Sequence, residues 1–547
     1  SEEIAPINEI GDREGAKLKD GEVTTAPGWK KLYADWIGGG WNALTGPVDF
    51  GGQGLPTMLS VAAFEMWNSG SLAFAIGPTL TIGAIEALEK HASDELQKTY
   101  LEKLVSGEWT GTMNLTEPQA GSDLAALKTR AERRDDGSYR IFGQKIFITY
   151  GEHDLTDNIV HLVLARLPDA PEGTRGISLF LVPKFLVEAD GTPGARNDLH
   201  CASLEHKLGI HASPTCVMIY GDGKFGNEPG AIGYLIGEEN KGLACMFTMM
   251  NNARLHVGMQ GVAVAEAAYQ KALAYAKERT QGKAAGHDGP GMSPIVEHRD
   301  VLRMLLTMKW LTAAIRAISY CCGHAFDMAR VTEGDEKKKW AERAGLWTPV
   351  AKAFSTDVGM EVASLGVQVH GGMGLIEETG AARYFRDARI APIYEGTNGI
   401  QAIDLVTRKL PLSDGAAVSG LIAELREDAE AVRTSNADGL NGVAEALTSA
   451  LDDLEAATEW LGLALRNGRK EEALAGATPY LRLFGLAAGS ALIARGAVRG
   501  EDDGGASARV AIARFAAFNL LPEAAALRHV VTGGGEKLAE AAETVFA

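Results

Sequence analysis

The chain has 547 residues, of which 46% are hydrophobic and 23% are charged, and its formal net charge is −18. This length corresponds to about three or four domains, and the apolar fraction excludes a mainly disordered protein. The acidity argues against a nucleic-acid-binding protein, which needs Lys and Arg to neutralise phosphates, and against docking on an anionic membrane. Five cysteines without a CxxC pair predict reduced thiols in a cytoplasmic protein and no metal site.

Residues 1–111 are predicted to form a helical domain. Within it, Ala84–Leu104 carries apolar residues at helical spacing and is followed closely by Gly107. The stretch Met66–Ile85 contains no charged residue and has about the length of a membrane span. Polar residues and Pro78 interrupt this stretch, so we expect a buried helix–loop–helix segment and no transmembrane helix.

Residues 112–237 have a different character. Short runs rich in β-branched residues alternate there with turn-forming clusters, which predicts an antiparallel β-domain in the form of a barrel or sandwich. The expected strands are Tyr139–Thr149, Asn158–Arg166, Gly176–Val182 and Cys216–Tyr220. Helical patterns do not alternate with these runs, so we do not expect a parallel, doubly wound sheet.

The chain becomes helical again over residues 238–410, where Ala253–Arg279 forms one long amphipathic pattern rich in Ala. Residues 411–547 are rich in Ala, Leu and Glu, and they predict an additional C-terminal helical domain. The expected order is therefore helices, a β-domain, helices and further helices, which describes a multidomain α+β protein.

The densest cluster of chemically useful residues contains the sequence IYEGT. In this motif Glu395 stands between Tyr394 and Gly396, and a glycine lets the backbone approach a ligand closely. A carboxylate against an apolar substrate pocket is desolvated, which raises its pKa toward the value that a general base needs near neutral pH. A surface glutamate in a turn explains this short motif equally well.

Three parts of the sequence form a set. They are Met113–Asp123 (MNLTEPQAGSD), Gly143–Gly151 (GQKIFITYG), and Gln368–Gly374 together with Arg386–Gln401 (QVHGGMG and RDARIAPIYEGTNGIQ). Together these parts resemble the acyl-CoA dehydrogenase family of flavoenzymes, and their motifs occur in the family's order. The resemblance extends over roughly residues 30–410.

The resemblance implies a fold and a reaction. The fold has an N-terminal helical domain, a middle antiparallel β-domain and a C-terminal four-helix bundle, followed here by the additional helical domain. The reaction is FAD-dependent oxidation of an acyl-CoA thioester, in which Glu395 removes the α-proton and the β-hydrogen leaves as hydride to flavin N5. The backbone N–H of Glu395 and a flavin ribityl hydroxyl polarise the thioester carbonyl. Some members carry the base on the long helix, where this chain has Ala253, which cannot act as a base.

The resemblance also assigns residues to the FAD site. Met113, Leu115 and Thr116 match the segment that contacts the isoalloxazine ring, although a strand end and a proline-led turn account for LTEP as well. Gly121 and Ser122 match the junction between flavin and CoA.

Two further FAD segments depart from the family pattern. Phe147 stands where the family commonly has Trp, so the stacking surface is kept and an indole N–H is lost, and Thr149 is the expected hydrogen-bond donor to the flavin. The family's long helix usually ends in Arg-x-x-Phe-Gly, whereas this one reads ERTQGK. Arg279 and Gln281 are therefore expected at the FAD pyrophosphate, with an exposed helix-end arginine as the alternative.

The glycine-rich segment implies an oligomer. Gln368, Gly371 and Gly372 match the family's dinucleotide loop, which is contributed across a subunit interface, so at least a homodimer is expected. Thr397 and Gly399 match further flavin contacts. The sequence has no GxGxxG followed by an acidic residue after a strand, so NAD is not expected.

The resemblance suggests an acyl-CoA site and a substrate. The residues that match substrate contacts are Ser122, Asn251, Arg254, Tyr394 and Gly396. A capping or salt-bridged arginine explains Arg254 equally well. The tail resembles that of a longer subgroup with an extra C-terminal helical domain. This subgroup includes enzymes that oxidise 3-(methylthio)propanoyl-CoA to 3-(methylthio)acryloyl-CoA in bacterial dimethylsulfoniopropionate breakdown. The resemblance implies this reaction, with electrons passed to an electron-transfer flavoprotein.

Alternatives to this substrate remain. Very-long-chain relatives use extra helices for membrane association, but residues 411–547 contain 20 acidic and 12 basic residues, which argues against that role. The same acidity argues against a non-catalytic, nucleic-acid-associated flavoprotein. A general short- or medium-chain fatty acyl-CoA dehydrogenase and an acyl-CoA oxidase stay open.

Overall fold

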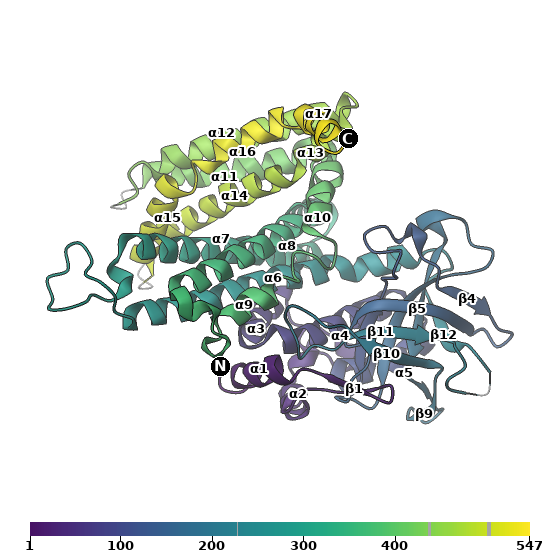
Figure 1. The fold of residues 1–547 in the computed structure, drawn as a ribbon. Helices are drawn as coiled ribbons and strands as arrows, with labels where there is room; N and C mark the ends of the chain where they lie inside the picture. The colour runs from purple at the N-terminus through teal and green to yellow at the C-terminus, as the bar shows by residue number, and fades with distance from the viewer. Residues whose placement is uncertain (227, 436–438, 500–504) are drawn as a thin grey trace. The chain divides into compact units, whose positions relative to one another are not determined.

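The computed structural model describes residues 1–547 except 227, 436–438 and 500–504, and it does not describe the side chains of Met249 and Asn251. The chain divides into two compact units, Ser1–His256 and Val257–Ala547. In Figure 1 the first unit runs from purple to blue and the second from teal to yellow. The division falls inside one long helix, α6 (Gly242–Glu278).

Helices form the N-terminal part of the first unit. They are α1 (Ile4–Glu14), α2 (Trp29–Gly38), α3 (Thr57–Gly70), α4 (Leu72–His91) and α5 (Asp94–Ser106). The predicted helix–loop–helix over Met66–Ile85 is confirmed, because Ser71 separates α3 from α4. The Ser71 hydroxyl accepts a hydrogen bond from the N–H of Phe74 at 3.2 Å and caps α4.

The pattern Ala84–Leu104 belongs to two helices rather than to the single helix that was predicted. Ala92 and Ser93 interrupt it, and the hydroxyl of Ser93 accepts a hydrogen bond from the N–H of Leu96 at 3.4 Å. A serine at this position satisfies an otherwise unpaired N–H and begins a new helix. The predicted end is confirmed, since Gly107 closes α5 with φ 81°.

Two described helices are long and apolar enough to cross a membrane by length and composition. They are α4 and α14 (Ala477–Arg499), and the bent pair α15 (Ala506–Asn519) and α16 (Glu523–Gly533) passes the same test as one broken span. In the most apolar windows of α4 and α14, 89% and 78% of the helix is buried inside the structure. Both helices are therefore interior elements of their own units.

The middle region forms one eight-stranded sheet with the order β10-β11-β5-β12-β7-β6-β3, and β4 lies beside β5 and β6. The strands are β3 (Thr110–Asn114), β4 (Arg130–Arg133), β5 (Tyr139–Thr149), β6 (Ile159–Arg166), β7 (Ile177–Pro183), β10 (Leu199–Leu204), β11 (Thr215–Tyr220) and β12 (Ala231–Ile236). All four predicted strands are confirmed to within a residue. Two small sheets pair β1 (Lys17–Lys19) with β2 (Glu22–Thr24) and β8 (Phe185–Val187) with β9 (Pro193–Arg196).

The sheet is antiparallel except for two parallel pairings with β6, which the sequence did not predict. Strand β3 runs parallel to β6, with Thr110 opposite Ile159, and β4 also meets β6 in a parallel contact. In the chain, the antiparallel pair β4 and β5 comes between β3 and β6. Strand β6 then runs in the same direction as β3. This arrangement places the ends of β3 and β5 close together.

Strands β6 and β7 are buried on both faces, because alternate side chains enter two different cores. Leu162 and Leu181 pack into the core that also contains residues of α4 and α5. Val163 and Phe180 enter the other core, together with Ile141. The sheet is therefore rigidly held on each side.

The second unit is helical. After α6 its first elements are α7 (Arg299–Val331), α8 (Gly334–His370), α9 (Ala381–Ala388) and α10 (Asn398–Asp404). Helices α6 and α8 approach so closely that a Cβ on Gly261 would lie 2.2 Å from the carbonyl oxygen of Ser355. Glycine is required at this crossing, because any side chain would collide with the α8 backbone.

The additional C-terminal helical domain packs on these helices. Its elements are α11 (Ala416–Thr434), α12 (Val443–Arg466), α13 (Lys470–Ala475), α14, α15, α16 and α17 (Gly535–Val545). Helix α14 contacts α7, α8 and α10, and the group α11, α12, α14 and α16 lies together in Figure 1. The rings of Trp347 in α8 and Phe484 in α14 meet edge to face at 5.9 Å.

Candidate active site

The loop that carries Glu395 connects α9 to α10 and has an uncommon backbone conformation. Glu395 has φ 53° and Gly396 has φ 85°, so two successive residues lie in the left-handed region. This conformation is ordinary for glycine and costs about 1–2 kcal/mol for other residues. Thr397 then begins α10, where its hydroxyl accepts a hydrogen bond from the N–H of Ile400 at 3.3 Å.

Side chains of α8 and α10 bind the carbonyl groups of this turn. Lys352 Nζ donates to the carbonyl oxygen of Gly396 at 2.9 Å and to Oδ1 of Asn398 at 2.8 Å. Gln401 Nε2 donates to the carbonyl oxygens of Glu395 and Gly396 at 3.4 and 3.3 Å. Lys352 and Gln401 are fully buried, so water does not compete for these contacts.

Tyr394 anchors the residue before the candidate base. Its hydroxyl donates a hydrogen bond to Oε1 of Gln260, which is buried in α6. Burial, and then the nearby charge of Glu395, raise the pKa of Tyr394 above its ordinary value, so the phenol stays neutral at physiological pH. Glu395 is thus fixed through its neighbours on both sides.

Two predicted flavin segments lie side by side in the first unit, where β3 and β5 end. The N–H of Ile146 donates to the carbonyl oxygen of Thr116 at 2.9 Å. The hydroxyl of Thr112 donates to the carbonyl oxygen of Thr149 at 2.7 Å. Met113 is buried between these contacts in β3. Residues separated by about thirty positions in sequence therefore form one structural edge.

A buried ion pair supports this edge. Lys145 Nζ donates to Oε1 of Glu117 at 2.8 Å and to the carbonyl oxygen of Leu115 at 3.0 Å. Glu117 also accepts from the N–H groups of Lys128 and Thr129 and from the Thr129 hydroxyl. Burial alone would raise the pKa of Glu117, but the Lys145 charge and these hydrogen bonds hold it at about 2. The carboxylate stays ionised and fixes the turn after Leu115.

The surface beside this edge is open to a ligand. Phe147 has φ 59° and is 58% exposed, whereas the next residue, Ile148, is buried. Gly121 and Ser122 are exposed, and apart from the chain neighbours no heavy atom of the described residues lies within 4 Å of the position that a Cβ on Gly121 would occupy. An exposed aromatic ring and open glycine backbone suit a planar ring system with a phosphate chain, so these residues fit a flavin dinucleotide.

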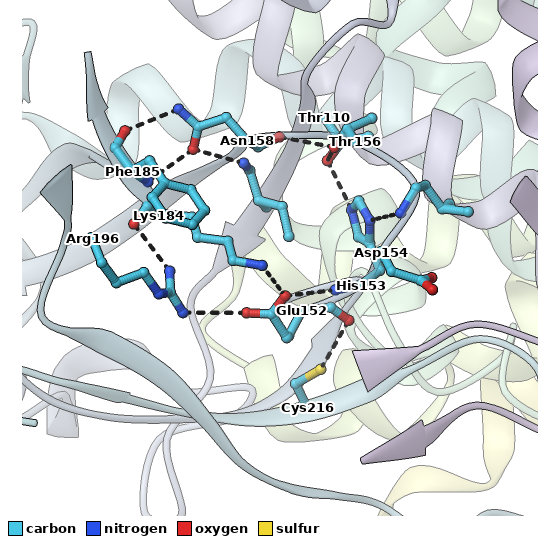
Figure 2. A network of polar contacts seen from close by, with 12 residues as sticks. Thr110, Glu152, His153, Asp154, Thr156, Asn158, Lys184, Phe185, Arg196 and Cys216 are labelled. Atoms are coloured by element: carbon cyan, nitrogen blue, oxygen red, sulfur yellow. Dashed lines mark hydrogen bonds and ion pairs between the residues drawn. The ribbon is translucent and has the colours of Figure 1, made fainter. Parts of the chain in front are cut away.

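Figure 2 shows the buried polar network that follows β5. Glu152 is 1% exposed and accepts from Lys184 and, at 3.5 Å, from Arg196. The carbonyl oxygen of Glu152 also accepts a weak hydrogen bond from Cys216 Sγ at 3.9 Å. Burial raises the pKa of Glu152 in opposition to the two cations. The network ties the turn after Thr149 to β8, β9 and β11.

His153 belongs to the same network and is neutral. Its Nδ1 accepts from the N–H of Leu155 at 3.2 Å, so Nε2 carries the proton and donates to the hydroxyl of Thr110 at 2.8 Å. Burial lowers the pKa of His153 to about 3, which agrees with this single protonation state. The histidine links the start of β3 to the turn after β5 and has a structural role.

The start of α6 carries the predicted CoA contacts. Arg254 is buried there, and the side chain of Asn251 lies outside the described residues. Asn252, which directly precedes Ala253 in α6, donates from Nδ2 to Oε1 of Glu86 in α4. Burial raises the pKa of Glu86 to about 8. Burial thus favours the neutral form of this carboxyl beside the start of α6.

The predicted dinucleotide residues of the second unit come together at the ends of α6 and α8. Tyr275, one turn before Arg279, stacks on His370 with ring centroids 4.4 Å apart. His370 directly precedes Gly371. Arg279 Nη2 donates to Oε1 of Gln281 at 3.3 Å, and both side chains are exposed. An exposed guanidinium suits a phosphate group, and the Tyr275–His370 contact brings the ends of the two helices together.

The glycine-rich loop itself is open. Gln368, Gly371 and Gly372 are exposed, and Gly371 has φ 59°. Apart from the chain neighbours, no described heavy atom lies within 4 Å of a Cβ position on either glycine, so the surface over both residues is open to a ligand. The N–H of Gly371 donates to the carbonyl oxygen of Gln368 at the end of α8. Gly399 is exposed and Thr397 is half-buried at the start of α10. These residues also fit a dinucleotide.

Comparison with known proteins identifies the class. Family models for the N-terminal, middle and C-terminal domains of acyl-CoA dehydrogenase match residues 1–108, 112–222 and 240–410. A model described as acetyl-CoA dehydrogenase C-terminal like matches residues 421–542. A 3-methylmercaptopropionyl-CoA dehydrogenase from Ruegeria pomeroyi is 46% identical over 544 residues, which cover 98% of this chain and 91% of that protein. The chain belongs to the acyl-CoA dehydrogenase family.

Solved structures of acyl-CoA dehydrogenases have the same fold. The butyryl-CoA dehydrogenase of Megasphaera elsdenii is 26% identical with a TM-score of 0.59, and the match covers 74% of this chain and 93% of that one. An acyl-CoA dehydrogenase from Bacillus anthracis, solved in complex with FAD, is 22% identical with a TM-score of 0.72, covering 94% and 85%. The second match shows that the fold recurs with helices beyond the dehydrogenase core.

The sequence-based predictions missed the residues that support the acyl-CoA dehydrogenase motifs. Lys145 and Glu117 lie within or beside the predicted flavin segments, yet neither was singled out as a buried pair. Gln401 ends the predicted base segment, and Lys352 lies 43 residues before Glu395. The one available signal for Lys352 is its place in the apolar run TPVAKAF, where a lysine on a buried face needs polar partners.

Proposed function

We propose that this acyl-CoA dehydrogenase family member oxidises 3-(methylthio)propanoyl-CoA to 3-(methylthio)acryloyl-CoA in the cytoplasm, with FAD as its cofactor. The substrate rests on the 46% identity, over 98% of the chain, with the Ruegeria pomeroyi 3-methylmercaptopropionyl-CoA dehydrogenase. The name of that protein denotes the same acyl group. The acidic tail is consistent with a protein that does not use it for docking on anionic lipid.

Glu395 is the proposed base for the α-proton. The observation that carries this assignment is the left-handed turn at Glu395 and Gly396, whose carbonyl groups are bound by buried side chains. Non-glycine residues in this conformation persist where the surroundings over-determine them, and such residues gather at functional sites. The backbone N–H of Glu395 donates to the thioester carbonyl oxygen, where negative charge develops as the α-proton leaves.

The reaction balances with one proton and one hydride. The α-carbon loses a proton to the Glu395 carboxylate, the β-carbon loses a hydrogen with its electron pair, and a carbon–carbon double bond forms between them. Bound FAD supplies the acceptor for that hydride at N5. The electrons then pass to an electron-transfer flavoprotein. Tyr394, Gly396, Ser122, Asn251 and Arg254 are the proposed contacts to the acyl-CoA.

The chain's own residues would hold FAD in two regions. Met113, Leu115, Thr116 and Thr149 would contact the isoalloxazine ring, with Phe147 offering a stacking face and Gly121 and Ser122 the junction with CoA. Arg279 and Gln281 would bind the pyrophosphate, and the remaining contacts would be Gln368, Gly371, Gly372, Thr397 and Gly399. In the family the dinucleotide loop reaches across a subunit interface, so we propose at least a homodimer.

Anaerobic titration of the purified holoprotein with a panel of acyl-CoA thioesters tests this proposal. We expect 3-(methylthio)propanoyl-CoA to bleach the flavin absorbance, and mass spectrometry to find a product lighter by two hydrogens. Lack of bleaching by every thioester would contradict the dehydrogenase assignment. Rapid peroxide formation in air would favour the oxidase alternative over transfer to an electron-transfer flavoprotein.

Butanoyl-CoA is the second candidate substrate. A butyryl-CoA dehydrogenase from Syntrophomonas wolfei is 38% identical over 433 residues, which cover 77% of this chain and 70% of that protein. The same panel separates the two candidates by their kcat/KM values. If butanoyl-CoA were strongly preferred and the methylthio thioester inert, the methylthio assignment would be wrong and the class assignment would stand.

A further inference from the structure

The turn at Glu395 needs support from outside its own sequence. Glu395 has φ 53°, a value that glycine adopts freely and glutamate does not, and Gly396 follows with φ 85°. Local backbone hydrogen bonds run from the N–H of Asn398 to the carbonyl oxygen of Pro392 at 3.0 Å and from the N–H of Tyr394 to the carbonyl oxygen of Ile390 at 3.2 Å. A non-glycine residue in this region relaxes unless neighbouring groups hold it.

Lys352 supplies that support from α8. Its ammonium group donates to the carbonyl oxygen of Gly396 at 2.9 Å, while Gln401 Nε2 donates to the same oxygen at 3.3 Å and to the Glu395 carbonyl oxygen at 3.4 Å. Both peptide planes that follow Glu395 are therefore held by side chains. With these planes fixed, the Cα–Cβ bond of Glu395 keeps one direction.

A polar network compensates for burying the lysine, and its outer residue, Asp357, is exposed overall. Asn398 lies between Lys352 and Asp357: its Oδ1 accepts from the ammonium at 2.8 Å, and its Nδ2 donates to Oδ1 of Asp357 at 2.7 Å. The hydroxyl of Thr356 also donates to Asn398 Oδ1 at 3.2 Å. Burial raises the pKa of Asp357, while the Asn398 hydrogen bond and the Lys352 charge oppose that rise. The lysine is thus held in place and directed at the turn.

We propose that Lys352 is a positioning residue for Glu395, acting through the carbonyl group of Gly396 with Gln401 as the second contact. This inference rests on the proposed role of Glu395 as the α-proton base. Lys352 does not touch the substrate in this account; it determines where the carboxylate is held. Misplacing a reacting group by about 1 Å can lower a rate by about a hundredfold.

Stopped-flow measurement of flavin reduction in Lys352→Met tests the inference. Methionine has a similar length and no charge, and the two acceptors that lose the ammonium, the Gly396 carbonyl and the Asn398 amide, are themselves uncharged. We expect a folded, FAD-containing protein in which substrate Kd changes by less than about twofold and the reduction rate falls about 10- to 100-fold. The isotope effect with α-dideuterated substrate should rise, because proton transfer becomes more limiting.

Two further variants make the result specific. Gln401→Met removes the other donor to the turn and should show the same signature with a smaller loss of rate. Ser355→Ala is the matched control: Ser355 is fully buried in α8, and its hydroxyl meets Ser319 of α7 at 3.4 Å instead of the turn. This control should reduce its flavin at the wild-type rate with an unchanged isotope effect.

Each outcome decides between the alternatives. A Lys352→Met protein with a reduction rate within twofold of wild type and an unchanged isotope effect would overturn the positioning role. A variant that fails to fold while Ser355→Ala folds would also overturn it, because it would assign Lys352 to global stability. Glu395→Gln is measured in parallel. An inactive Glu395→Gln beside a fully active Lys352→Met refutes the positioning alone, whereas an active Glu395→Gln refutes the base and the positioning together.

Discussion

Two lysines of this chain, Lys145 in β5 and Lys352 in α8, are both completely buried, yet they hold their surroundings in different ways. Lys145 meets the carboxylate of Glu117 at 2.8 Å, so two full charges lie together inside the β-domain. Lys352 donates to a peptide carbonyl and to the amide of Asn398, and the carboxylate of Asp357 lies one hydrogen bond further. The first arrangement is a buried ion pair, and the second is a chain of hydrogen bonds that ends at a strained turn.

Because the partners of Lys145 and Lys352 differ in charge, a different property of the protein should depend on each lysine. Removing one member of a buried ion pair leaves an uncompensated charge in a medium of low polarity, which strongly destabilises the fold. Removing the Lys352 ammonium leaves a carbonyl oxygen and an amide to rearrange, and the nearest carboxylate of the network, Asp357, is an exposed residue that water can reach. Stability should therefore depend on Lys145, and the geometry of Glu395 should depend on Lys352.

Lys145→Met gives the largest expected effect on stability. It leaves the Glu117 carboxylate buried without its cation, and the free energy of unfolding should fall by about 3–5 kcal/mol. The thermal midpoint of the holoprotein, followed by circular dichroism, measures the loss. Lys352→Met should lower the midpoint much less, and the double variant Lys145→Met with Glu117→Leu should recover most of the loss. Equal midpoints for the two single variants would remove the distinction between the lysines.

Acid pH should weaken the ion pair between Lys145 and Glu117. The folded-state pKa of Glu117, about 2, lies below the 4.5 of an ordinary glutamate. A depressed carboxyl pKa stabilises the folded protein above the unfolded value, and this stabilisation is lost as the pH falls through the folded value. Thermal midpoints measured between pH 5 and about 2 should therefore fall more steeply in wild type than in the double variant. Parallel curves would show that the Glu117 pair does not contribute.

Phe147→Leu should give the smallest effect on stability. The ring is 58% exposed, so the free energy of unfolding should change by less than about 0.5 kcal/mol. The loss of a stacking face should weaken FAD binding by about 0.5–1.5 kcal/mol, which fluorescence titration of the FAD-free protein with FAD measures. Leu463→Ala, at an exposed position of α12, is the control and should bind FAD as wild type does. Unchanged FAD affinity in Phe147→Leu would exclude stacking on this ring.

Elements set by local patterns were predictable from the sequence. Strand β5 is confirmed with its bounds, Tyr139–Thr149, because a long β-branched and aromatic run between turns has few other solutions. The break between α4 and α5 was missed because the apolar spacing continues across Ser93. The helix break depends on the capping hydrogen bond of Ser93, and the spacing of apolar residues does not indicate such a bond. The parallel pairing of β3 with β6 depends on the order of the intervening strands, which no single run encodes.

The residues of the candidate active site also differ in how far the sequence predicted them. Glu395 was found because IYEGT is a contiguous motif. Lys352 and Lys145 were not found, because the carbonyl oxygens that they bind are distant in the sequence. The apolar run around Lys352 indicates a buried lysine but does not indicate its partners. The partners of Lys145, Leu115 and Glu117, lie about thirty residues earlier, and only the pairing of the strand ends brings them into contact.

Flavin reduction in Glu395→Gln is the most direct test of Glu395 as the α-proton base. Glutamine keeps the size of the side chain and the turn, but it cannot accept the α-proton. We expect FAD to remain bound and the rate of anaerobic bleaching by 3-(methylthio)propanoyl-CoA to fall by about 10²- to 10⁴-fold, the usual contribution of a general base. Bleaching at the wild-type rate would contradict the assignment of Glu395 as the base.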